Sequence, residues 1–261
     1  MIFDALVCDL DGVVYRGDEV VPGAPEAIET LRSSGVAVLF CTNNSRRTPA
    51  DYVTLLRGFG VPAAESDVLT SAEVTADELE RRGYPGKTAF VVGGEGIRAA
   101  LRRAGLEVLA PDDDAGRADV VAVGWDRSFT YERLRRAATL VRGGAFFVAT
   151  NDDATFPAAG GVQWPGAGSL LAAVETASGR RAEVMGKPHA PMAEAAARRL
   201  PRGARVAVVG DRPDTDLALA DRRGWIKILV LSGVTDEAGA AALEAAPDLV
   251  VGSLADIAPS Q

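Results

Sequence analysis

The chain has 261 residues, 48% hydrophobic and 25% charged, so it can bury a sizeable core and is not globally disordered. Its 28 basic and 36 acidic residues give a net charge of −8, which argues against nucleic acid as a partner. Its apolar runs are too short to span a bilayer, and Met1–Asp4 lacks the basic region of a signal peptide, so we expect a cytoplasmic protein with no membrane partner.

Apolar strand-like runs alternate with helical patterns along the chain. The predicted strands are Phe3–Cys8, Val36–Cys41, Ala89–Val92, Val120–Val123, Ala145–Ala149, Arg205–Val209, Ile226–Leu231 and Leu249–Val251. The predicted helices are Ala24–Ser33, Pro49–Phe59, Ser71–Arg82, Gly96–Ala104, Tyr131–Val141, Ser169–Ser178, Pro191–Leu200, Asp214–Arg223 and the Ala-rich segment 238–246. This order predicts an α/β fold with a mainly parallel sheet between helices.

The chain is predicted to form two domains. Polar clusters follow the first, second and sixth predicted strands, and in such folds ligands bind at the carboxyl ends of strands. The segment 81–178 lacks acidic pairs at its strand ends and is bracketed by the Gly/Pro-rich stretches 82–86 and 164–168. We therefore predict a discontinuous core domain, 1–80 and 179–261, with an inserted domain at 81–178.

Two cysteines, Cys8 and Cys41, lie in apolar runs that predict buried strands. Free core thiols are the favoured interpretation, and a disulfide between neighbouring strands is the alternative.

An acidic pair, Asp9 and Asp11, follows the first strand directly. In an extended chain, residues i and i+2 point to the same side, so both acids are expected to project together, and Gly12 lets the backbone turn away. Two carboxylates placed so closely require a cation or a shared proton between them. The pair is therefore a candidate for metal-assisted chemistry.

Three further polar clusters are candidates for the same site. Gly210-Asp-Arg-Pro-Asp-Thr-Asp216 follows a strand and offers Asp211 as a metal ligand with Asp214 or Asp216 behind it, although a polar loop with a helix cap is an equal alternative. Thr42-Asn-Asn-Ser45 could bind an anion or form an ordinary turn. Lys187, within Gly186-Lys-Pro-His189, could balance converging carboxylates or lie on the surface.

A motif of another class occurs at Gly94-x-Gly96-x-x-Ala99, which follows a strand and opens a helix. With Asp114 at a suitable distance it fits a loose dinucleotide fingerprint. A dinucleotide-binding oxidoreductase is therefore an alternative function, and an ordinary strand–helix turn is the favoured interpretation of the motif.

The four clusters occur in the order acidic pair, Thr-Asn turn, Gly-Lys-Pro turn and Gly-Asp-x-x-x-x-Asp, and this order resembles the haloacid dehalogenase-like phosphohydrolase superfamily. Further runs resemble its subfamily IIA, a branch that includes 4-nitrophenylphosphatase-like and phosphoglycolate phosphatases. These runs are 11–17, 22–24, 42–49, 70–71, 149–152, 165–168 and 231–235. The resemblance implies a Rossmann-like core with an inserted C2-type α/β cap, which agrees with the predicted insert.

The resemblance also implies roles for individual residues. Asp9 would be the nucleophile that forms an aspartyl-phosphate, and Asp11 the general acid and base. Mg²⁺ would be held by Asp9, the Asp11 carbonyl and Asp211, with Asp214 and Asp216 ordering metal-bound water or Lys187. The expected phosphate-binding residues are Thr42, Asn43, Asn44 and Lys187, and the expected cap residues facing the leaving group are Asn151 and Asp153.

The chain is thus predicted to be a Mg²⁺-dependent phosphatase that hydrolyses small phosphorylated metabolites. A sugar or polyol phosphate, phosphoglycolate, a nucleotide monophosphate and pyridoxal phosphate all remain open as substrates. The resemblance implies that the cap can mediate a homodimer. A non-catalytic binding module that kept the fold is the remaining alternative, and the intact acids Asp9, Asp11, Asp211 and Asp216 argue against it.

Overall fold

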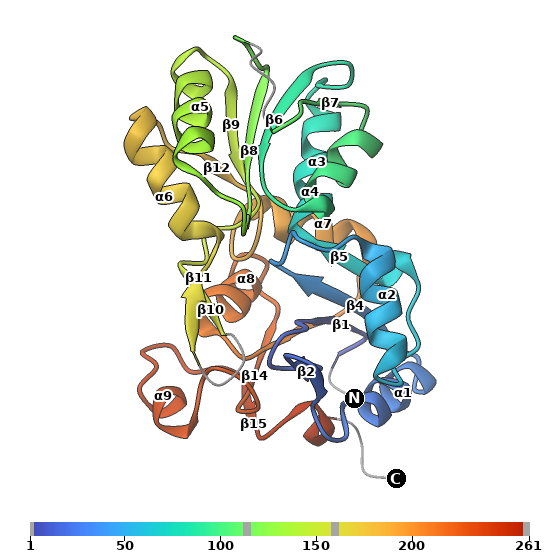
Figure 1. Cartoon of the computed structure of the whole chain (residues 1–261). Helices are drawn as coiled ribbons and strands as arrows, with labels where there is room; N and C mark the ends of the chain where they lie inside the picture. The colour runs from blue at the N-terminus through green and yellow to red at the C-terminus, as the bar shows by residue number, and fades with distance from the viewer. Residues whose placement is uncertain (1–2, 112–115, 158–161, 258–261) are drawn as a thin grey trace. The chain divides into compact units, whose positions relative to one another are not determined.

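The computed structural model describes residues 3–111, 116–157 and 162–257, which form two compact units. The first unit contains Met1–Thr42, Pro49–Leu69 and Lys187–Gln261, and the second contains Asn43–Thr48 and Thr70–Gly186 (Figure 1). Each unit has its own sheet and its own hydrophobic core.

A six-stranded sheet forms the centre of the first unit. Its strand order is β15 (Leu249–Val251), β14 (Ile226–Val230), β13 (Val206–Gly210), β1 (Ala5–Cys8), β4 (Ala37–Thr42) and β5 (Val68–Thr70). The first five are parallel to their neighbours, and Cys8 lies opposite Val209 on one side and Phe40 on the other. The carboxyl ends of β1, β4 and β13 therefore meet at one edge, where the polar clusters follow them.

Helices of the first unit bury both faces of this sheet. α1 (Ala24–Ser33) and α2 (Pro49–Gly58) supply Ile28, Leu31, Tyr52 and Leu56 to the core around Leu6, Phe40 and Val209. α7 (Ala190–Arg199) packs against β4, and the short α8 (Ala218–Asp221) packs against β13 and β14. The remaining elements are peripheral: β2 (Tyr15–Arg16), β3 (Glu19–Val20), η1 (Glu65–Asp67), α9 (Glu237–Ala241) and η4 (Leu254–Asp256).

The second unit is a smaller α/β layer structure. Its sheet has the order β12 (Glu183–Val184), β9 (Phe146–Ala149), β8 (Val120–Val123), β6 (Thr88–Val92) and β7 (Glu107–Val108), all parallel to their neighbours. α5 (Tyr131–Arg142) and α6 (Ala167–Ser178) cover one face, and α3 (Ser71–Arg81) and α4 (Glu95–Arg103) lie on the other (Figure 1). β10 (Thr155–Pro157) and β11 (Gln163–Pro165) form a separate antiparallel pair.

The predicted α/β class with parallel sheets is confirmed, and each of the eight predicted strands is present. The strands β2, β3, β5, β7, β10, β11 and β12 have two or three residues each, too few to show a period in the sequence. The predicted helix Asp214–Arg223 is instead a wide π-helical turn, η3 (Pro213–Leu217), followed by α8. Pro213 cannot donate a backbone hydrogen bond, and Asp216 turns inward to accept one from the Arg212 amide. The predicted helix 238–246 is shorter and ends at Ala241.

The compact units differ from the predicted domain bounds at the loop Asn43–Thr48 and at two elements. The helix α3 and the strand β12 belong to the second unit, whereas the predicted insert begins at 81 and ends at 178. The helix packs on α4, with an ion pair between Glu73 and Arg103, and the strand pairs with β9. The role of the second unit as a cap stays a prediction.

Both cysteines are buried free thiols, so the favoured interpretation holds. Cys8 lies opposite Phe40 in the sheet, so Cys8 and Cys41 point to opposite faces and cannot pair. Across the described ranges, every helix is too short or too polar to cross a membrane.

Candidate active site

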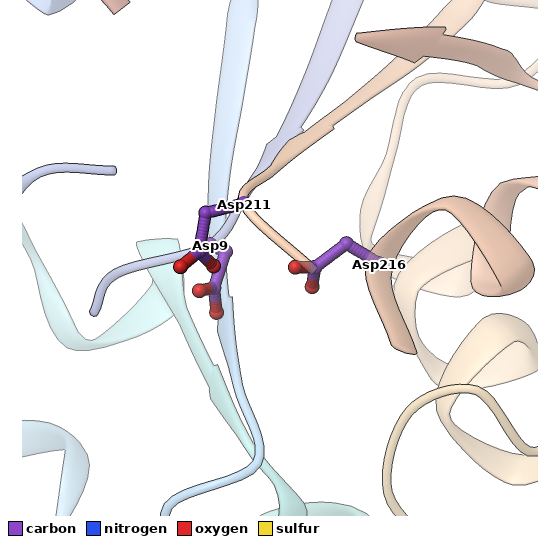
Figure 2. A group of neighbouring side chains, drawn as sticks. All are labelled: Asp9, Asp211 and Asp216. Atoms are coloured by element: carbon purple, nitrogen blue, oxygen red, sulfur yellow. The ribbon is translucent and has the colours of Figure 1, made fainter. Parts of the chain in front are cut away.

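Three acidic side chains converge at one edge of the first unit's sheet (Figure 2). Asp9 follows β1, Asp211 follows β13, and Asp216 lies on η3 shortly after it. One carboxylate oxygen of each lies within 4.8 Å of the others, and the three residues are only 9%, 2% and 1% exposed. Like charges buried this closely are stable only with a cation or a proton among them.

Glycines create the space that these carboxylates occupy. A Cβ atom on Gly210 would lie 2.2 Å from Asp216 Cβ, and one on Gly233 would lie 2.0 Å from Asp211 Oδ2. Gly12, whose φ of 85° lies in the left-handed region, would place a Cβ 2.4 Å from the same Asp211 oxygen. A side chain at any of these three positions would displace an acid from the cluster.

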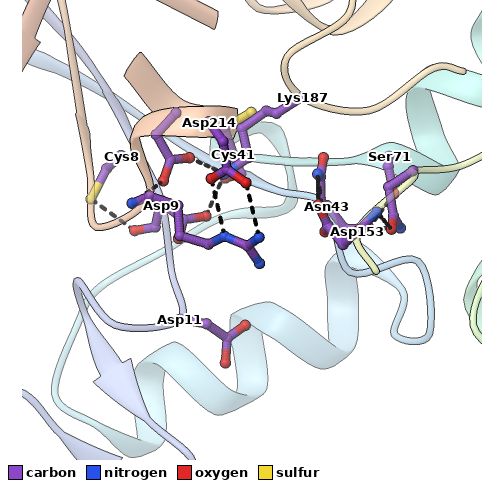
Figure 3. Close-up of polar contacts among 12 residues, drawn as sticks. Cys8, Asp9, Asp11, Cys41, Asn43, Ser71, Asp153, Lys187 and Asp214 are labelled. Atoms are coloured by element: carbon purple, nitrogen blue, oxygen red, sulfur yellow. Dashed lines mark hydrogen bonds and ion pairs between the residues drawn. The ribbon is translucent and has the colours of Figure 1, made fainter. Parts of the chain in front are cut away.

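Lys187 provides the positive charge of the site (Figure 3). Its Nζ atom donates hydrogen bonds to Asp9 Oδ1 at 2.5 Å, to Asp216 Oδ1 at 2.7 Å and to the Cys41 carbonyl at 3.0 Å. Only 4% of its side chain is exposed. The lysine therefore joins the ends of β1 and β4 to η3. The alternative interpretation, that Lys187 lies on the surface, was wrong.

The charges of this cluster perturb one another. Burial alone would lower the pKa of Lys187, but the charges of Asp216 and Asp9 outweigh it, so the pKa lies well above its ordinary value. Burial raises the pKa of Asp9, with Lys187 opposing and Asp216 adding to the rise. Burial and the charge of Asp216 raise the pKa of Asp211 to about 7. One ammonium thus does not balance three carboxylates.

The residues present fit a hard divalent cation. Asp211 Oδ1 is buried and has no hydrogen-bond partner among the described residues, while its Oδ2 accepts from the Val234 amide at 2.7 Å. Thr235 Oγ1 donates to the Asp211 carbonyl at 2.6 Å and so fixes the backbone at this position. An uncompensated buried oxygen beside excess negative charge suits a hard divalent cation, which binds oxygen ligands such as carboxylates. No role was predicted for the Val234 amide, the Thr235 hydroxyl or the Cys41 carbonyl, although the run 231–235 resembles the subfamily.

Asp11 and Asp214 lie outside the three-acid cluster. Tyr15 donates to Asp11 Oδ2 at 3.4 Å, and the Asp11 carboxylate is directed away from Asp9 (Figure 3). The expectation that the two acids project together was wrong because the chain bends at Leu10, whose carbonyl accepts from the Val14 amide at 2.9 Å. Asp214 is 69% exposed at its side chain and pairs with Arg212, whereas Asp216 is buried and pairs with Lys187.

Thr42 is the last residue of β4 and is 3% exposed, directly after the carbonyl that accepts from Lys187. The residues that follow belong to the second unit. Asn44 is exposed, and its Oδ1 accepts from the Arg46 amide at 3.0 Å, which is the geometry of an Asx turn.

The two predicted cap residues, Asn151 and Asp153, form hydrogen bonds with Asn43 inside the second unit. Asn151 donates to the Asn43 carbonyl at 2.7 Å, and both Asp153 oxygens accept from Asn43 Nδ2, at 3.2 and 3.1 Å. Their predicted contact with the leaving group stays a prediction.

The dinucleotide alternative is not supported by the structure. The first turn of α4 is covered by the loop Asn43–Thr48, because the Gly96 amide donates to the Arg46 carbonyl at 2.8 Å. A Cβ atom on Gly96 would lie 2.5 Å from the Ser45 carbonyl oxygen, so the glycine serves this packing and leaves no space there for a pyrophosphate. Asp114, the acid of the fingerprint, lies outside the described residues.

Comparison with known proteins identifies the class of this chain. Residues 6–107 match a family model described as a haloacid dehalogenase-like hydrolase, and residues 184–257 match one described as HAD-hydrolase-like. Human chronophin is 41% identical over 267 positions, which cover 95% of this chain and 90% of that protein. The chain therefore belongs to the haloacid dehalogenase-like hydrolases.

Solved relatives resemble the whole chain. A p-nitrophenyl phosphatase from Archaeoglobus fulgidus matches with a TM-score of 0.90 and 32% identity, covering 99% of each chain. A glycerol phosphate phosphatase from Mycobacterium tuberculosis, solved in complex with magnesium, matches with a TM-score of 0.89 and 32% identity, covering 99% of this chain and 77% of that one. The predicted family, its subfamily IIA and the phosphatase class are confirmed.

Proposed function

We propose that the chain hydrolyses small phosphate monoesters with Mg²⁺ and through a phosphorylated Asp9. The observation that carries this proposal is the position of Lys187, which bonds both to Asp9 and to Asp216 beside the unpartnered Asp211 oxygen. A carboxylate held next to a buried ammonium and a cation-binding oxygen suits attack on a phosphoryl group, whose charge must be offset as it transfers.

The reaction proceeds in two displacements. A carboxylate oxygen of Asp9 attacks phosphorus, the bond from phosphorus to the alcohol oxygen breaks, and Asp11 donates its proton to that oxygen. Asp11 then takes a proton from a water molecule that attacks the phosphorus, and the bond between phosphorus and Asp9 breaks to release inorganic phosphate.

Binding and orientation come from the residues around the nucleophile. Asp9, Asp211 and the Asp11 carbonyl would hold Mg²⁺, which offsets the charge of the phosphoryl oxygens. Lys187 and Thr42 bind those oxygens together with the backbone amide of Asn43. Asp216 orients Lys187 through the hydrogen bond of 2.7 Å, and this assignment leaves Asp214 without a part in the chemistry.

The proposed substrates are small phosphorylated metabolites with an alcohol leaving group. Sugar and polyol phosphates, phosphoglycolate, nucleotide monophosphates and pyridoxal phosphate all belong to this class. The predicted homodimer and the cytoplasmic location likewise stay proposals.

Release of inorganic phosphate from a panel of esters, with p-nitrophenyl phosphate as the reference, tests the proposal. We expect turnover with Mg²⁺, reversible loss in EDTA, and no turnover by Asp9→Asn. Asp18→Asn is the matched control, because Asp18 is an exposed acid in the turn between β2 and β3 and its change removes the same charge. Normal turnover by Asp9→Asn would contradict the mechanism, and no release from any ester would favour the non-catalytic alternative.

A further inference from the structure

The loop Asn43–Thr48, which leaves β4 after Thr42, is built into the second unit at several points. Thr150 Oγ1 donates to Ser45 Oγ at 3.0 Å, and the Gly96 amide donates to the Arg46 carbonyl at 2.8 Å. The Arg46 guanidinium lies 5.4 Å from the ring centre of Trp125, within cation–π range. The loop is therefore fixed by second-unit residues, although it continues a strand of the first unit.

Asn43 is held by bonds to both its side chain and its backbone carbonyl. Its Nδ2 donates to both oxygens of Asp153, and its backbone carbonyl accepts from Ser71 Oγ at 2.6 Å and from Asn151 Nδ2 at 2.7 Å. The Asp153 amide in turn donates to Asn151 Oδ1 at 3.2 Å, which links the two partners. Asn43 and Asn151 are only 8% and 4% exposed. Both the side-chain amide and the carbonyl of Asn43 are thus engaged inside the second unit.

We infer that Asp153, together with Asn151, is a positioning residue that orients Asn43 for phosphate binding. This inference rests on the proposed function, which assigns the backbone amide of Asn43 to the phosphoryl oxygens. Fixing the Asn43 side chain and carbonyl restricts rotation of the residue, and so presets the direction of its amide. Preset donors stabilise a transferring phosphoryl group better than mobile ones, because no reorganisation is required during the reaction.

The alternative is that Asn151 and Asp153 contact the alcohol of the substrate and select it. The structure favours positioning because each carboxylate oxygen of Asp153 already accepts a hydrogen bond from Asn43. Asn151 uses its amide nitrogen on Asn43 and its oxygen on Asp153. The two roles predict different kinetics: a positioning residue affects every phosphate ligand equally, whereas a selecting residue affects each alcohol differently.

The experiment compares Asp153→Ala, Asp153→Asn and Asp77→Asn with the wild-type chain. Asp153→Ala removes both acceptors, and Asp153→Asn keeps one acceptor oxygen. Asp77→Asn is the matched control, since Asp77 is an acid of the same unit that pairs with Arg103 on the surface. For each variant we would measure kcat and KM on p-nitrophenyl phosphate and on two alkyl phosphates, the Ki of inorganic phosphate, the Mg²⁺ concentration for half activity, and Tm.

We expect Asp153→Ala to lose kcat/KM at least tenfold, by the same factor on all three esters, and to raise the Ki of inorganic phosphate. The Mg²⁺ requirement should stay unchanged, Asp153→Asn should stay within about threefold of wild type, and Asp77→Asn should match wild type. If Asp153→Ala does not fold, Asn151→Ala removes a donor to the same carbonyl and is measured instead.

Two results would overturn the inference. One is an Asp153→Ala variant that behaves like Asp77→Asn. The other is a loss that differs among the alcohols while the Ki of inorganic phosphate stays constant, which would assign Asp153 to substrate selection. Failure of the proposed function is separate, because it would appear as a wild-type chain that releases no phosphate.

Discussion

Replacing Lys187 by methionine tests the charge balance of the site through stability alone. The substitution keeps the length and apolar part of the side chain but removes the ammonium that bonds to Asp9 and Asp216. The site would then hold Asp9, Asp211 and Asp216, one oxygen of each within 4.8 Å of the others, without the ammonium that bonds to two of them.

The magnitude follows from burial. The side chains of Lys187, Asp9 and Asp216 are 4%, 11% and 1% exposed. Solvent therefore screens the two ion pairs that Lys187 forms with these acids only weakly. Removing one partner of a buried pair costs about 3–5 kcal/mol, because the remaining charge is left uncompensated. A loss of about 4 kcal/mol lowers Tm on the order of 10 °C in a chain of this size. The loss should shrink at pH 5, where the freed carboxylates can take up protons.

Thermal unfolding in EDTA at pH 8 and pH 5 provides the assay. Lys227→Met is the matched control, because Lys227 pairs with Asp221 at 3.0 Å where the Asp221 side chain is 60% exposed. Such a surface pair contributes roughly 0–1 kcal/mol, so its loss should move Tm by at most a few degrees. Equal Tm values for Lys187→Met and Lys227→Met at pH 8 would refute the buried charge balance.

Three further predictions concern the metal, the glycines and the proton donor. The metal-free folded chain keeps a proton on Asp211 up to pH about 7, whereas the unfolded chain releases it near 3.8. Stability without metal therefore falls as pH rises between these values, and Mg²⁺ should raise Tm more at pH 8 than at pH 5.5; equal shifts in a thermal-shift assay would contradict this. Gly233→Ala should displace Asp211 and weaken Mg²⁺ binding measured by calorimetry at least tenfold, whereas Gly58→Ala, with open space around its Cβ, should leave it unchanged. Asp11→Asn should slow alkyl phosphates at least tenfold more than p-nitrophenyl phosphate in steady-state assays, since p-nitrophenolate leaves without a proton; equal slowing would remove Asp11 as the acid.

The sequence predicted the long elements well because their patterns are local. Strands such as Val120–Val123 are continuous apolar runs, and helices such as Tyr131–Arg142 begin at a capping residue, Thr130. Short pairing strands and the π-helical turn at Pro213–Leu217 were missed, because they depend on partners distant in the chain or on a single inward side chain.

The sequence predicted which residues form the candidate site, but it did not predict which of them contact one another. The motif order placed Asp9, Lys187 and Asp211 together, and the structure brings them to one sheet edge. The sequence could not distinguish the role of Asp214 from that of Asp216. Both acids follow the same strand, and only the local turn decides which side chain points inward. It also could not show that Asn151 and Asp153 bind Asn43, since these residues are more than 100 positions apart.

By itself, the sequence determined the family, the alternation of strands and helices, and the identity of the acids and the lysine that phosphate chemistry requires. These features can be read from the types of residues and their spacing along the chain. The tertiary structure decided which of those charged side chains lie close enough to interact. The aligned ends of β1, β4 and β13 bring Asp9, Lys187 and Asp211 within a few ångströms, and Gly12, Gly210 and Gly233 leave the space for it. Burial and close approach are properties of the packed chain, and they turn ordinary carboxylates into a site that needs a cation.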